Sequence, residues 1–463
     1  MIPLSIAEIA RMTDASLDNV PDPAAIVAGP VVIDSRQAAP GSLFAALPGE
    51  HADGHDFAPA AIAAGAAVVL GTRPAGVPAL IVADVPAALG RLARAVVDRL
   101  PQLTIAAITG SAGKTTTKDL AAQLIGSLGP TVSPQNSFNN EIGHPLTVLR
   151  AGEDTRYLVA ELSARGPGHI AALCEISPPS LGAVLCVGNA HAGEFGSMEQ
   201  VAAAKAELPR ALPAAGVALL NADDPLVAAM AGVTAARVVT FGQSAGADVR
   251  AARLSLDKLS RPRFTLEMPD GAAAVELKLH GEHNVTNALA AAALAGQLGM
   301  DVGAIGAGLS AATAQSRWRM EVTERPDGVI IINDAYNASP EAVTAALAAL
   351  RVIAAGRRAY AVLGRMAELG DRSREFHEKA GMIAARSGLA GLIAVGDEAA
   401  PMLTGAKAAG GFAGELLAVP DGPAAVAALG ERLAPGDVVL VKASRAAGLQ
   451  TVALALAAGE VAR

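Results

Sequence analysis

The segment from Thr109 to Thr116 carries the clearest chemical signature in this sequence. It reads Thr-Gly-Ser-Ala-Gly-Lys-Thr-Thr and directly follows the apolar run Thr104–Ile108. A glycine-containing turn between a strand and a helix directs backbone N–H groups and the positive end of a helix dipole at one point, which suits a polyphosphate. The usual P-loop spacing has a glycine where Ile108 stands, so an ordinary strand–helix turn is the alternative. Because Gly-Lys-Thr-Thr is intact in this context, we predict an ATP site.

The residues of this loop are predicted to contact the nucleotide. The Lys114 ammonium would reach the β- and γ-phosphates, and the Thr115 hydroxyl would bind Mg²⁺. The predicted ATP-contacting residues of the loop are Thr109, Gly110, Ser111, Ala112, Gly113, Lys114, Thr115 and Thr116.

Two polar residues follow later apolar runs, at the points where the corresponding strands should end. Glu161 comes directly after Tyr157–Ala160, and His191 follows the run Leu181–Val187. In an open parallel sheet, ligands bind beyond the carboxyl ends of the strands, so Lys114, Glu161 and His191 are expected to converge. A carboxylate, an imidazole and a hydroxyl around a triphosphate indicate Mg²⁺ binding. From these residues alone, a strand-end acid and a capping histidine are equally good interpretations.

Two further segments have weaker signals. The loop Asn136–Pro145 is rich in amides, which both donate and accept hydrogen bonds and so suit a sugar or a peptide ligand. A turn-rich connector is the alternative. Lys205 lies in the predicted helical stretch Val201–Leu208, and its local sequence predicts a solvated lysine on a helix surface.

These residues lie in a sequence that alternates between strands and helices. Short apolar runs bounded by Gly, Pro, Asn or Asp predict buried parallel strands. One helix between them has Leu120, Leu124 and Leu128 at four-residue spacing, with Gly129 as its expected C-cap and Pro130 after it. This alternation is typical of a doubly wound α/β sheet. The predicted strands are Thr104–Ile108, Tyr157–Ala160, Leu181–Val187, Val217–Leu220 and Val238–Phe241.

The alternation breaks once and then resumes. Phe264–Met268 and Val275–Leu279, joined by the turn Pro269-Asp270-Gly271, predict a β-hairpin that extends the central sheet in antiparallel fashion. A second strand–helix series begins near Arg319. In it, Ser339 is a predicted N-cap before a helix that runs through Leu350. Its predicted strands are Val329–Ile332, Tyr360–Leu363, Leu392–Val395 and Val438–Val441.

Length and composition fit a multidomain protein with well-packed cores. The chain has 463 residues, of which 52% are hydrophobic and 17% charged, so general disorder is excluded. Its net charge of −8 argues against a general nucleic-acid binder. There is no apolar run long enough to span a membrane, and the N-terminal residues lack the pattern of a signal peptide. Two cysteines, Cys174 and Cys186, fit a reducing compartment, so a cytoplasmic protein is expected.

Several motifs resemble those of the Mur ligase family, in the order in which that family carries them. The first lie near the N-terminus and resemble the uridine-nucleotide-binding domain. The family also has a shortened P-loop, which matches Thr109–Thr116. The remaining segments lie in the central and C-terminal parts of the chain. The matching segments are Asp34–Arg36, Leu43–Glu50, Asp53–Phe57, Asn136–Pro145, Asn189–Ser197, Asn221–Asp224, His280–Asn284, Gly364–Gly370 and Val441–Arg445.

The segment Asp334–Pro340 is the most diagnostic of these. It resembles the Asp-x-Tyr-Asn-Ala-Asn-Pro pattern of the MurF-type branch, which adds D-alanyl-D-alanine, although Ser339 replaces the usual Asn. The Asp-Asn-Pro-Arg motif of the diamino-acid-adding relatives has no counterpart that we find. In Val441–Arg445, Ala443 replaces a common Gly.

The resemblance implies a three-domain α/β protein: a small domain over residues 1–98, a central P-loop-type domain over 99–318, and a Rossmann-like domain over 319–463. It implies ATP-driven ligation of D-alanyl-D-alanine to UDP-N-acetylmuramoyl-tripeptide, with domain closure on substrate binding. We expect the protein to be a monomer.

The implied Mg²⁺ ligands are Thr115, Glu161, His191 and Lys205, the last as a carbamylated lysine. Further implied ATP contacts are Asn284, Asn287, Arg317, Asp334 and Asn337. The implied substrate contacts are Ser35, Arg36, Phe44, Gly49, Asn136, Asn139, Asn140, Lys442, Ser444 and Arg445.

Three alternatives remain at this level. Another ligase of the same mechanism would add a different amino acid or use a folate or cyanophycin acceptor. A nucleotide-dependent switch would hydrolyse ATP only to change partners, and a small-molecule kinase would release a phosphorylated product. The interpretation as a switch does not explain the loop Asn136–Pro145 or the C-terminal strand–helix series.

Overall fold

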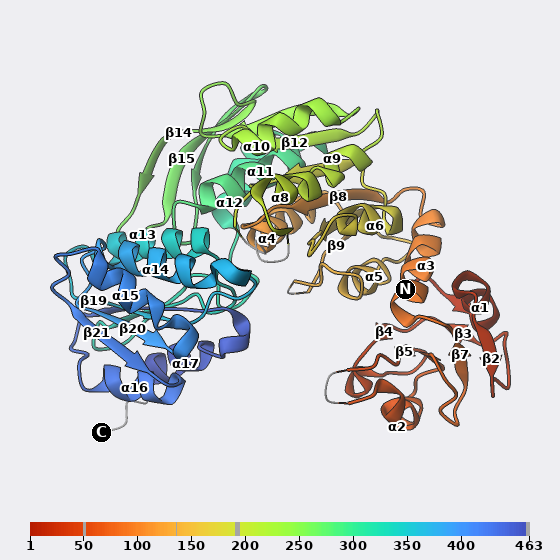
Figure 1. Ribbon diagram of the computed structural model, residues 1–463. Coiled ribbons are helices and arrows are strands. Elements are labelled where there is room, and N and C mark those ends of the chain that lie inside the picture. Colours follow the sequence, from red (N-terminus) through yellow and green to blue (C-terminus); the bar gives the residue numbers. More distant parts are fainter. Residues whose placement is uncertain (50–51, 136, 190–194, 460–463) are drawn as a thin grey trace.

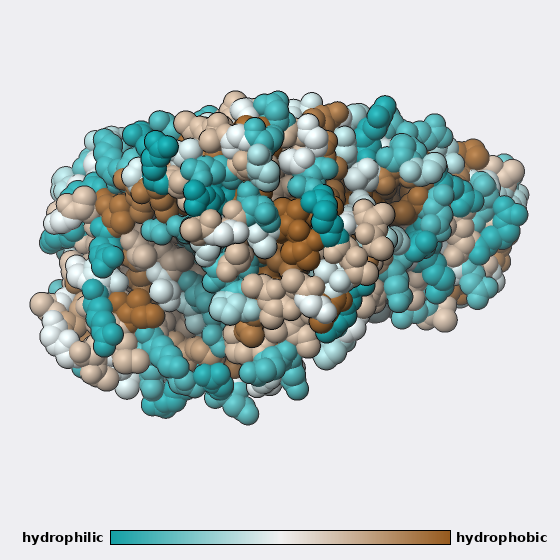
Figure 2. All heavy atoms as spheres, turned by 90° about the horizontal axis from the view of Figure 1, so that it is seen from above, coloured by the Kyte–Doolittle hydropathy of each residue, from teal (hydrophilic) through white to brown (hydrophobic). Residues whose placement is uncertain are grey.

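The computed structural model describes residues 1–49, 52–135, 137–189 and 195–459. The chain forms three lobes in an arch, with the N-terminal and C-terminal lobes at opposite ends of a central one (Figure 1). No helix in the described part of the chain is both long enough and apolar enough to cross a membrane. Hydrophilic and hydrophobic side chains are interspersed on the face seen from above, which is hollowed in the left part of the view (Figure 2).

The N-terminal lobe is built on a five-stranded sheet with the order β2-β7-β6-β5-β4. A short pair, β1 (Leu4–Ser5) and β3 (Ile26–Val27), lies beside it. The strands of the sheet are β2 (Ser16–Asp18), β4 (Val31–Val32), β5 (Leu43–Ala45), β6 (Val68–Gly71) and β7 (Ala79–Ile81). The helices are α1 (Ile6–Thr13), α2 (Ala58–Ala63) and α3 (Val85–Asp98).

The central lobe is a nine-stranded sheet with the order β16-β15-β14-β13-β12-β11-β8-β10-β9. Strands β8 to β13 pair in parallel, and the β14–β15–β16 segment adds antiparallel pairs at one edge, as the hairpin pattern predicts. The strands are β8 (Thr104–Thr109), β9 (Thr131–Val132), β10 (Tyr157–Glu161), β11 (Leu181–Val184), β12 (Val217–Asn221), β13 (Arg237–Gly242), β14 (Val249–Leu256), β15 (Pro262–Met268) and β16 (Gly271–Glu276).

Helices cover both faces of this sheet, so the prediction of a doubly wound architecture is confirmed. Side chains of α4 (Lys114–Ile125), α11 (Asn284–Gln297) and α12 (Val302–Ala311) pack into the core on one face. The opposite face is covered by α6 (His169–Ile176), α8 (Met198–Lys205) and α9 (Glu207–Ala211). Two shorter helices are α5 (Gly143–Val148) and α10 (Pro225–Ala228).

Three predicted elements in this lobe have wrong boundaries. The second strand of the hairpin, expected over Val275–Leu279, is β16 over Gly271–Glu276, because Gly271 already pairs with Met268. The helix after the phosphate loop ends at Ile125 with Gly126 as its C-cap, so Gly129 is not the cap and Leu128 is 38% exposed beyond the helix. Strand β11 ends at Val184 rather than at Val187. The Leu185 amide still donates to the Thr109 carbonyl of β8 at 2.9 Å, whereas the Val187 amide donates to the Asp224 carboxylate at 2.7 Å instead of to a neighbouring strand.

The C-terminal lobe is a six-stranded sheet with the order β17-β18-β22-β19-β20-β21, parallel except for β17. The predicted helix start is confirmed, since Ser339 Oγ accepts from the Ala342 amide at 3.2 Å. The strands are β17 (Glu321–Glu324), β18 (Ile330–Asn333), β19 (Ala359–Leu363), β20 (Gly391–Val395), β21 (Glu415–Val419) and β22 (Val438–Lys442). The helices are α13 (Pro340–Ala354), α14 (Ser373–Ala385), α15 (Pro401–Ala408), α16 (Gly422–Gly430) and α17 (Gln450–Ala458).

The apolar cores divide the molecule unevenly. One cluster of buried side chains runs from the N-terminal lobe into the central one: Leu89 and Leu92 of α3 share it with Ile105, Leu149 and Leu158. The C-terminal lobe has two clusters of its own, one on each face of its sheet. The N-terminal and central lobes are therefore joined by a common core. The fully buried residues of the C-terminal lobe form separate clusters, one of which is contacted by half-buried Leu259 of the central lobe.

Candidate functional site

The phosphate-binding loop has the geometry that its sequence predicts. Gly113 is the N-cap of α4 with φ +83°, and a Cβ at this position would collide with Asn287 Oδ1. Gly110 has φ +154° and lies against Leu185. Lys114 Nζ donates to the Gly110 carbonyl at 2.7 Å, so the ammonium folds back over the loop. Burial lowers the pKa of Lys114, and the Glu161 carboxylate opposes this effect.

Glu161, at the end of β10, lies beside the first turn of α4. Its Oε1 is 3.3 Å from Thr115 Oγ1 and accepts from Asn139 Nδ2 at 2.6 Å. Its Oε2 is buried and has no hydrogen-bond partner among the described residues. A buried carboxylate oxygen without a partner is costly, and a divalent cation beside a hydroxyl would satisfy it. Thr115 and Glu161 therefore fit the predicted Mg²⁺ site.

Part of that predicted site lies outside the described residues. His191, an implied Mg²⁺ ligand, lies outside the described residues, as does Asn136, an implied substrate contact. Within the described ranges, no group of three or more His, Cys, Asp or Glu side chains is arranged to hold a metal.

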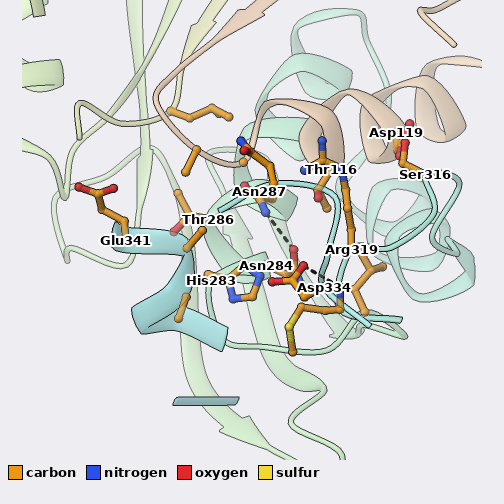
Figure 3. A pocket seen from close by; sticks show the side chains of 18 of the residues that line it. Thr116, Asp119, His283, Asn284, Thr286, Asn287, Ser316, Arg319, Asp334 and Glu341 are labelled. Carbon is orange, nitrogen blue, oxygen red and sulfur yellow. Dashed lines mark hydrogen bonds between the residues drawn. The ribbon is translucent and has the colours of Figure 1, made fainter. Parts of the chain in front are cut away.

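A cavity of about 300 Å³ lies next to the loop, between the central and C-terminal lobes. Asn284 and Asn287 project into it from the start of α11, and Asn287 Nδ2 donates to Asn284 Oδ1 at 2.9 Å (Figure 3). Asn287 Oδ1 accepts from Thr117 Oγ1 at 3.3 Å, which ties α11 to α4. The residues lining the cavity include Ser111, Ala112, Gly113, Thr116, Cys186, His283, Asn284, Asn287, Arg319, Asp334, Asn337, Glu341 and Lys442.

The C-terminal lobe contributes a polar wall to this cavity. Lys442 is buried, and its Nζ lies 2.5 Å from Asp334 Oδ2 and 2.8 Å from the Asn337 carbonyl. Asp334 Oδ1 also accepts from the Met320 amide at 3.0 Å. Asp334 and Asn337, which the resemblance implies as nucleotide contacts, both line this cavity. Lys442, expected to bind substrate, is instead paired within this wall.

The arginine that enters the cavity is Arg319, not Arg317. Arg317 is exposed and does not line the cavity. Arg319 Nη2 donates to Thr115 Oγ1 at 2.8 Å, and its guanidinium stacks over Tyr336 at 4.3 Å from the ring centre. Its neighbours Trp318 and Met320 have φ of +60° and +51°, a conformation that non-glycine residues rarely adopt. This unusual backbone turns Arg319 toward the phosphate loop, and spacing alone gives no sign of it.

Lys205 is buried, so the prediction of a solvated lysine is wrong. It is the last residue of α8, and only 1% of its surface is exposed. Burial, and after it the charge of Lys114, lower the pKa of Lys205 to about 7. Near neutral pH, a large fraction of a lysine with this pKa is the neutral amine, which is the reactive form.

The predicted substrate residues fall into different environments. Asn139 contacts Glu161, whereas Asn140 Oδ1 accepts from the Gly143 amide at 2.8 Å in the turn before α5, as in the connector alternative. Phe44 is buried at 1% exposure in the core of the N-terminal lobe, which excludes its side chain from a binding surface. Gly49 lies in a turn, where its amide donates to the Ala52 carbonyl at 2.9 Å.

The remaining N-terminal and C-terminal candidates lie at the surface or in loops. Arg36 is exposed and paired with Asp34 at 2.7 Å, next to half-buried Ser35. Ser444 is buried and its Oγ accepts from the Ala367 amide at 2.8 Å, so it holds a loop together. Arg445 is exposed, and its guanidinium lies 5.6 Å from the Trp318 ring and 5.2 Å from the Tyr336 ring.

Three family models match successive parts of the chain. They are the Mur ligase family catalytic domain over residues 30–112, the Mur ligase middle domain over 108–295, and the Mur ligase glutamate ligase domain over 318–445.

Named relatives and solved structures match nearly the whole chain. A UDP-N-acetylmuramoyl-tripeptide–D-alanyl-D-alanine ligase from Mycobacterium tuberculosis is 50% identical over 503 residues, covering 99% of each chain. The crystal structure of MurF from Acinetobacter baumannii matches with a TM-score of 0.87 and 31% identity, covering 98% of this chain and 99% of that one. MurF ligase from Thermotoga maritima, in complex with ADP, matches with a TM-score of 0.80 and 29% identity, covering 94% and 98%.

Proposed function

Because this chain belongs to the Mur ligase family, we propose that it joins D-alanyl-D-alanine to UDP-N-acetylmuramoyl-tripeptide at the expense of ATP. The products are UDP-N-acetylmuramoyl-pentapeptide, ADP and phosphate, so the enzyme works in peptidoglycan precursor synthesis. The observation that carries this proposal is the 50% identity, over 99% of the chain, to a ligase named for that reaction.

The reaction needs activation because a carboxylate is a poor electrophile. The terminal carboxylate of the tripeptide attacks the γ-phosphorus of ATP, the bond to the β–γ bridging oxygen breaks, and an acyl phosphate and ADP result. The amine of D-alanyl-D-alanine then attacks the acyl carbon and loses a proton. The tetrahedral intermediate expels phosphate and leaves an amide. Positioning and charge neutralisation are the protein's main contributions to both steps.

Two cations of this chain are suited to the phosphoryl transfer. Lys114 lies on the phosphate loop, and Arg319 reaches Thr115 from the link between the central and C-terminal lobes. Both would neutralise charge on the transferring group. Thr115 and Glu161 would hold Mg²⁺, with His191 as a further ligand. When bound, the ion would offset the negative charge of the β- and γ-phosphates.

Lys205 is proposed to carry a carbamate. Its burial favours the neutral amine, which can react with carbon dioxide, and the product would be an anion in place of a cation. Near the phosphate loop, such an anion is a suitable oxygen ligand for a second Mg²⁺.

The three segments 1–98, 99–318 and 319–463 are proposed to divide the work. The first, with Ser35, Arg36 and Gly49, would bind the uridine end of the tripeptide substrate, with Asn139 closer to the reacting end. The third would bind the dipeptide. Exposed Arg445, flanked by Trp318 and Tyr336, suits a short peptide with a free carboxylate and methyl side chains. We expect a cytoplasmic monomer.

The test is phosphate release from ATP and Mg²⁺ with UDP-N-acetylmuramoyl-tripeptide, with and without D-alanyl-D-alanine, together with the mass of the product. Release that requires both substrates and yields the UDP-linked pentapeptide is expected. Release that is indifferent to both substrates would contradict the proposal.

A further inference from the structure

We propose that Glu341 is a positioning residue that couples the C-terminal lobe to the phosphate-binding loop through Gly188 and Asn189. The coupling rests on the proposed function only in that ATP is taken as the ligand of the cavity. The three residues bridge two lobes whose fully buried apolar residues, in the described part of the chain, fall in separate clusters.

The first half of the bridge joins α13 to the segment after β11. Glu341 Oε1 accepts two hydrogen bonds from Asn189, one from its backbone amide and one from Nδ2, both at 2.8 Å. Glu341 is the second residue of α13, after the Ser339 N-cap and Pro340. The positive end of the helix dipole stabilises a carboxylate at this position.

The second half joins the same segment to the phosphate loop. The Gly188 amide donates to Ser111 Oγ at 2.9 Å, and Ser111 Oγ lies 3.2 Å from the Gly188 carbonyl, to which it donates. Ser111 precedes Lys114 by three residues. A displacement of α13 is therefore transmitted to the phosphate loop by two adjacent sets of hydrogen bonds.

Close packing at Gly188 fixes the distance between the two halves. A Cβ on Gly188 would lie 3.0 Å from both Cδ and Oε1 of Glu341, so a side chain there would press on the carboxylate. The other carboxylate oxygen, Oε2, is buried without a hydrogen-bond partner among the described residues. Glu341 stands at the rim of the cavity, at the start of α13 (Figure 3).

The cavity depends on this bridge because its walls come from both lobes. Ser111 and Gly113 lie on the central side, whereas Asp334, Asn337 and Lys442 lie on the side that carries α13. If the bridge is broken, conformations with separated walls gain population. The apparent affinity for a nucleotide that contacts both walls then falls in proportion to the population of the joined state.

The bridge itself is tested by hydrogen exchange of the ligand-free full-length chain, read at the amides of Gly188 and Asn189. Three variants and one control are compared. Glu341→Ala removes the acceptor, Glu341→Gln keeps an oxygen acceptor, and Gly188→Ala adds a Cβ that presses on the Glu341 carboxylate. Thr344→Ala is the control, because Thr344 is exposed on α13 and its Oγ1 donates to the Pro340 carbonyl of the same helix. Glu341→Ala and Gly188→Ala are expected to speed exchange of the Asn189 amide, and Glu341→Gln and Thr344→Ala to leave it unchanged. Unchanged protection in Glu341→Ala would overturn the proposal.

The coupling is tested by calorimetric titration of the same variants with a non-hydrolysable ATP analogue and Mg²⁺. Loss of hydrogen bonds to a charged acceptor should weaken binding about ten- to a hundredfold in Glu341→Ala and Gly188→Ala. Glu341→Gln should retain most of the affinity for the analogue, which a general loss of structure would not predict. Melting temperatures of all variants verify that they fold. Equal weakening in Glu341→Gln and Glu341→Ala would overturn the bridge as an acceptor contact. If the wild-type chain fails to bind the analogue, the proposed function fails, and the hydrogen-exchange result still decides on the bridge.

Discussion

At the scale of single residues, Arg319 and Arg317 form a natural pair of test and control. They are two positions apart, but only Arg319 stacks on Tyr336 and reaches the Thr115 hydroxyl. Its Nε is buried without a partner among the described residues, so the guanidinium has a donor available for a bound anion. We expect Arg319→Ala to lower kcat/KM for ATP by about 10²- to 10³-fold, because a preorganised cation beside the transferring phosphoryl group is lost.

Arg317→Ala is expected to keep a rate within about twofold of the wild type, since its side chain is exposed. Steady-state phosphate release measures both variants under the same conditions. A large loss of rate in Arg317→Ala together with a normal rate in Arg319→Ala would show that Arg317 makes the phosphate contact, as the resemblance implies.

Lys205 leads to a prediction about pH. Its pKa of about 7 means that the amine is mainly neutral above that pH and mainly protonated below it. Only the neutral amine reacts with carbon dioxide, so the carbamate should decline as the pH falls through about 7. We expect a carbamate resonance in carbon NMR spectra recorded with ¹³C-bicarbonate, absent in Lys205→Ala and retained in a variant of exposed Lys407. A resonance that persists in Lys205→Ala would place the modification elsewhere.

These two residues also mark where prediction from sequence fails. Lys205 ends a short helix whose sequence resembles any solvated one, and its burial depends on the sheet and helices packed around it. Arg319 depends on left-handed backbone at Trp318 and Met320, which residue preferences disfavour. In contrast, Lys114, Thr115 and Glu161 follow from local rules, because a loop and a strand end fix where they point.

At the scale of secondary-structure elements, Gly113 and Gly168 occupy equivalent positions with different surroundings. Each is the N-cap of the helix that follows a strand of the central sheet, with φ of +83° and +84°. A Cβ on Gly113 would meet Asn287, whereas a Cβ on Gly168 would have no atom within 4 Å. The two positions share the backbone strain of a non-glycine residue, about 1 kcal/mol, and differ in the collision.

Gly113→Ala is therefore expected to weaken binding of an ATP analogue by tenfold or more, on the order of 1.4 kcal/mol. Gly168→Ala should lower the melting temperature slightly and leave nucleotide affinity unchanged. Calorimetry and thermal unfolding of the two variants separate these effects. Equal affinities in both variants would show that the loop tolerates displacement of Asn287.

The strands of the central sheet were predictable because buried parallel strands are short apolar runs, and β8, β10, β12 and β13 match within one residue at each end. The errors lie where tertiary contacts decide. Strand β11 ends earlier than predicted, and the segment after it is held by Asp224. The edge strand β21 consists of exposed and half-buried residues, so it lacks the signal of a buried strand.

At the scale of the whole molecule, the cores indicate which lobe moves. Helix α3 joins the N-terminal and central lobes: Gly90 packs against Ile176, and Arg94 donates to the Glu175 carbonyl at 2.9 Å. The link to the C-terminal lobe instead passes through Trp318 and Met320, two residues in strained backbone. Strain of this kind is concentrated at sites that switch. The resemblance implies domain closure, and the distribution of cores leads us to expect the motion at the junction with the C-terminal lobe.

We therefore expect nucleotide binding to move the C-terminal lobe against a rigid pair formed by the other two. Cysteines introduced at exposed Ala60, Ala231 and Lys407 place one label on each lobe, while native Cys174 and Cys186 are buried or half-buried. On addition of a non-hydrolysable ATP analogue, the distance between labels at 231 and 407 should shorten, and that between 60 and 231 should stay constant, in double electron–electron resonance. A change in the second distance would mean that the core shared through α3 yields, since a packed core resists continuous deformation. If neither distance changes, the free enzyme already has the arrangement that binds nucleotide, with Arg319 and Glu341 in position before the nucleotide arrives.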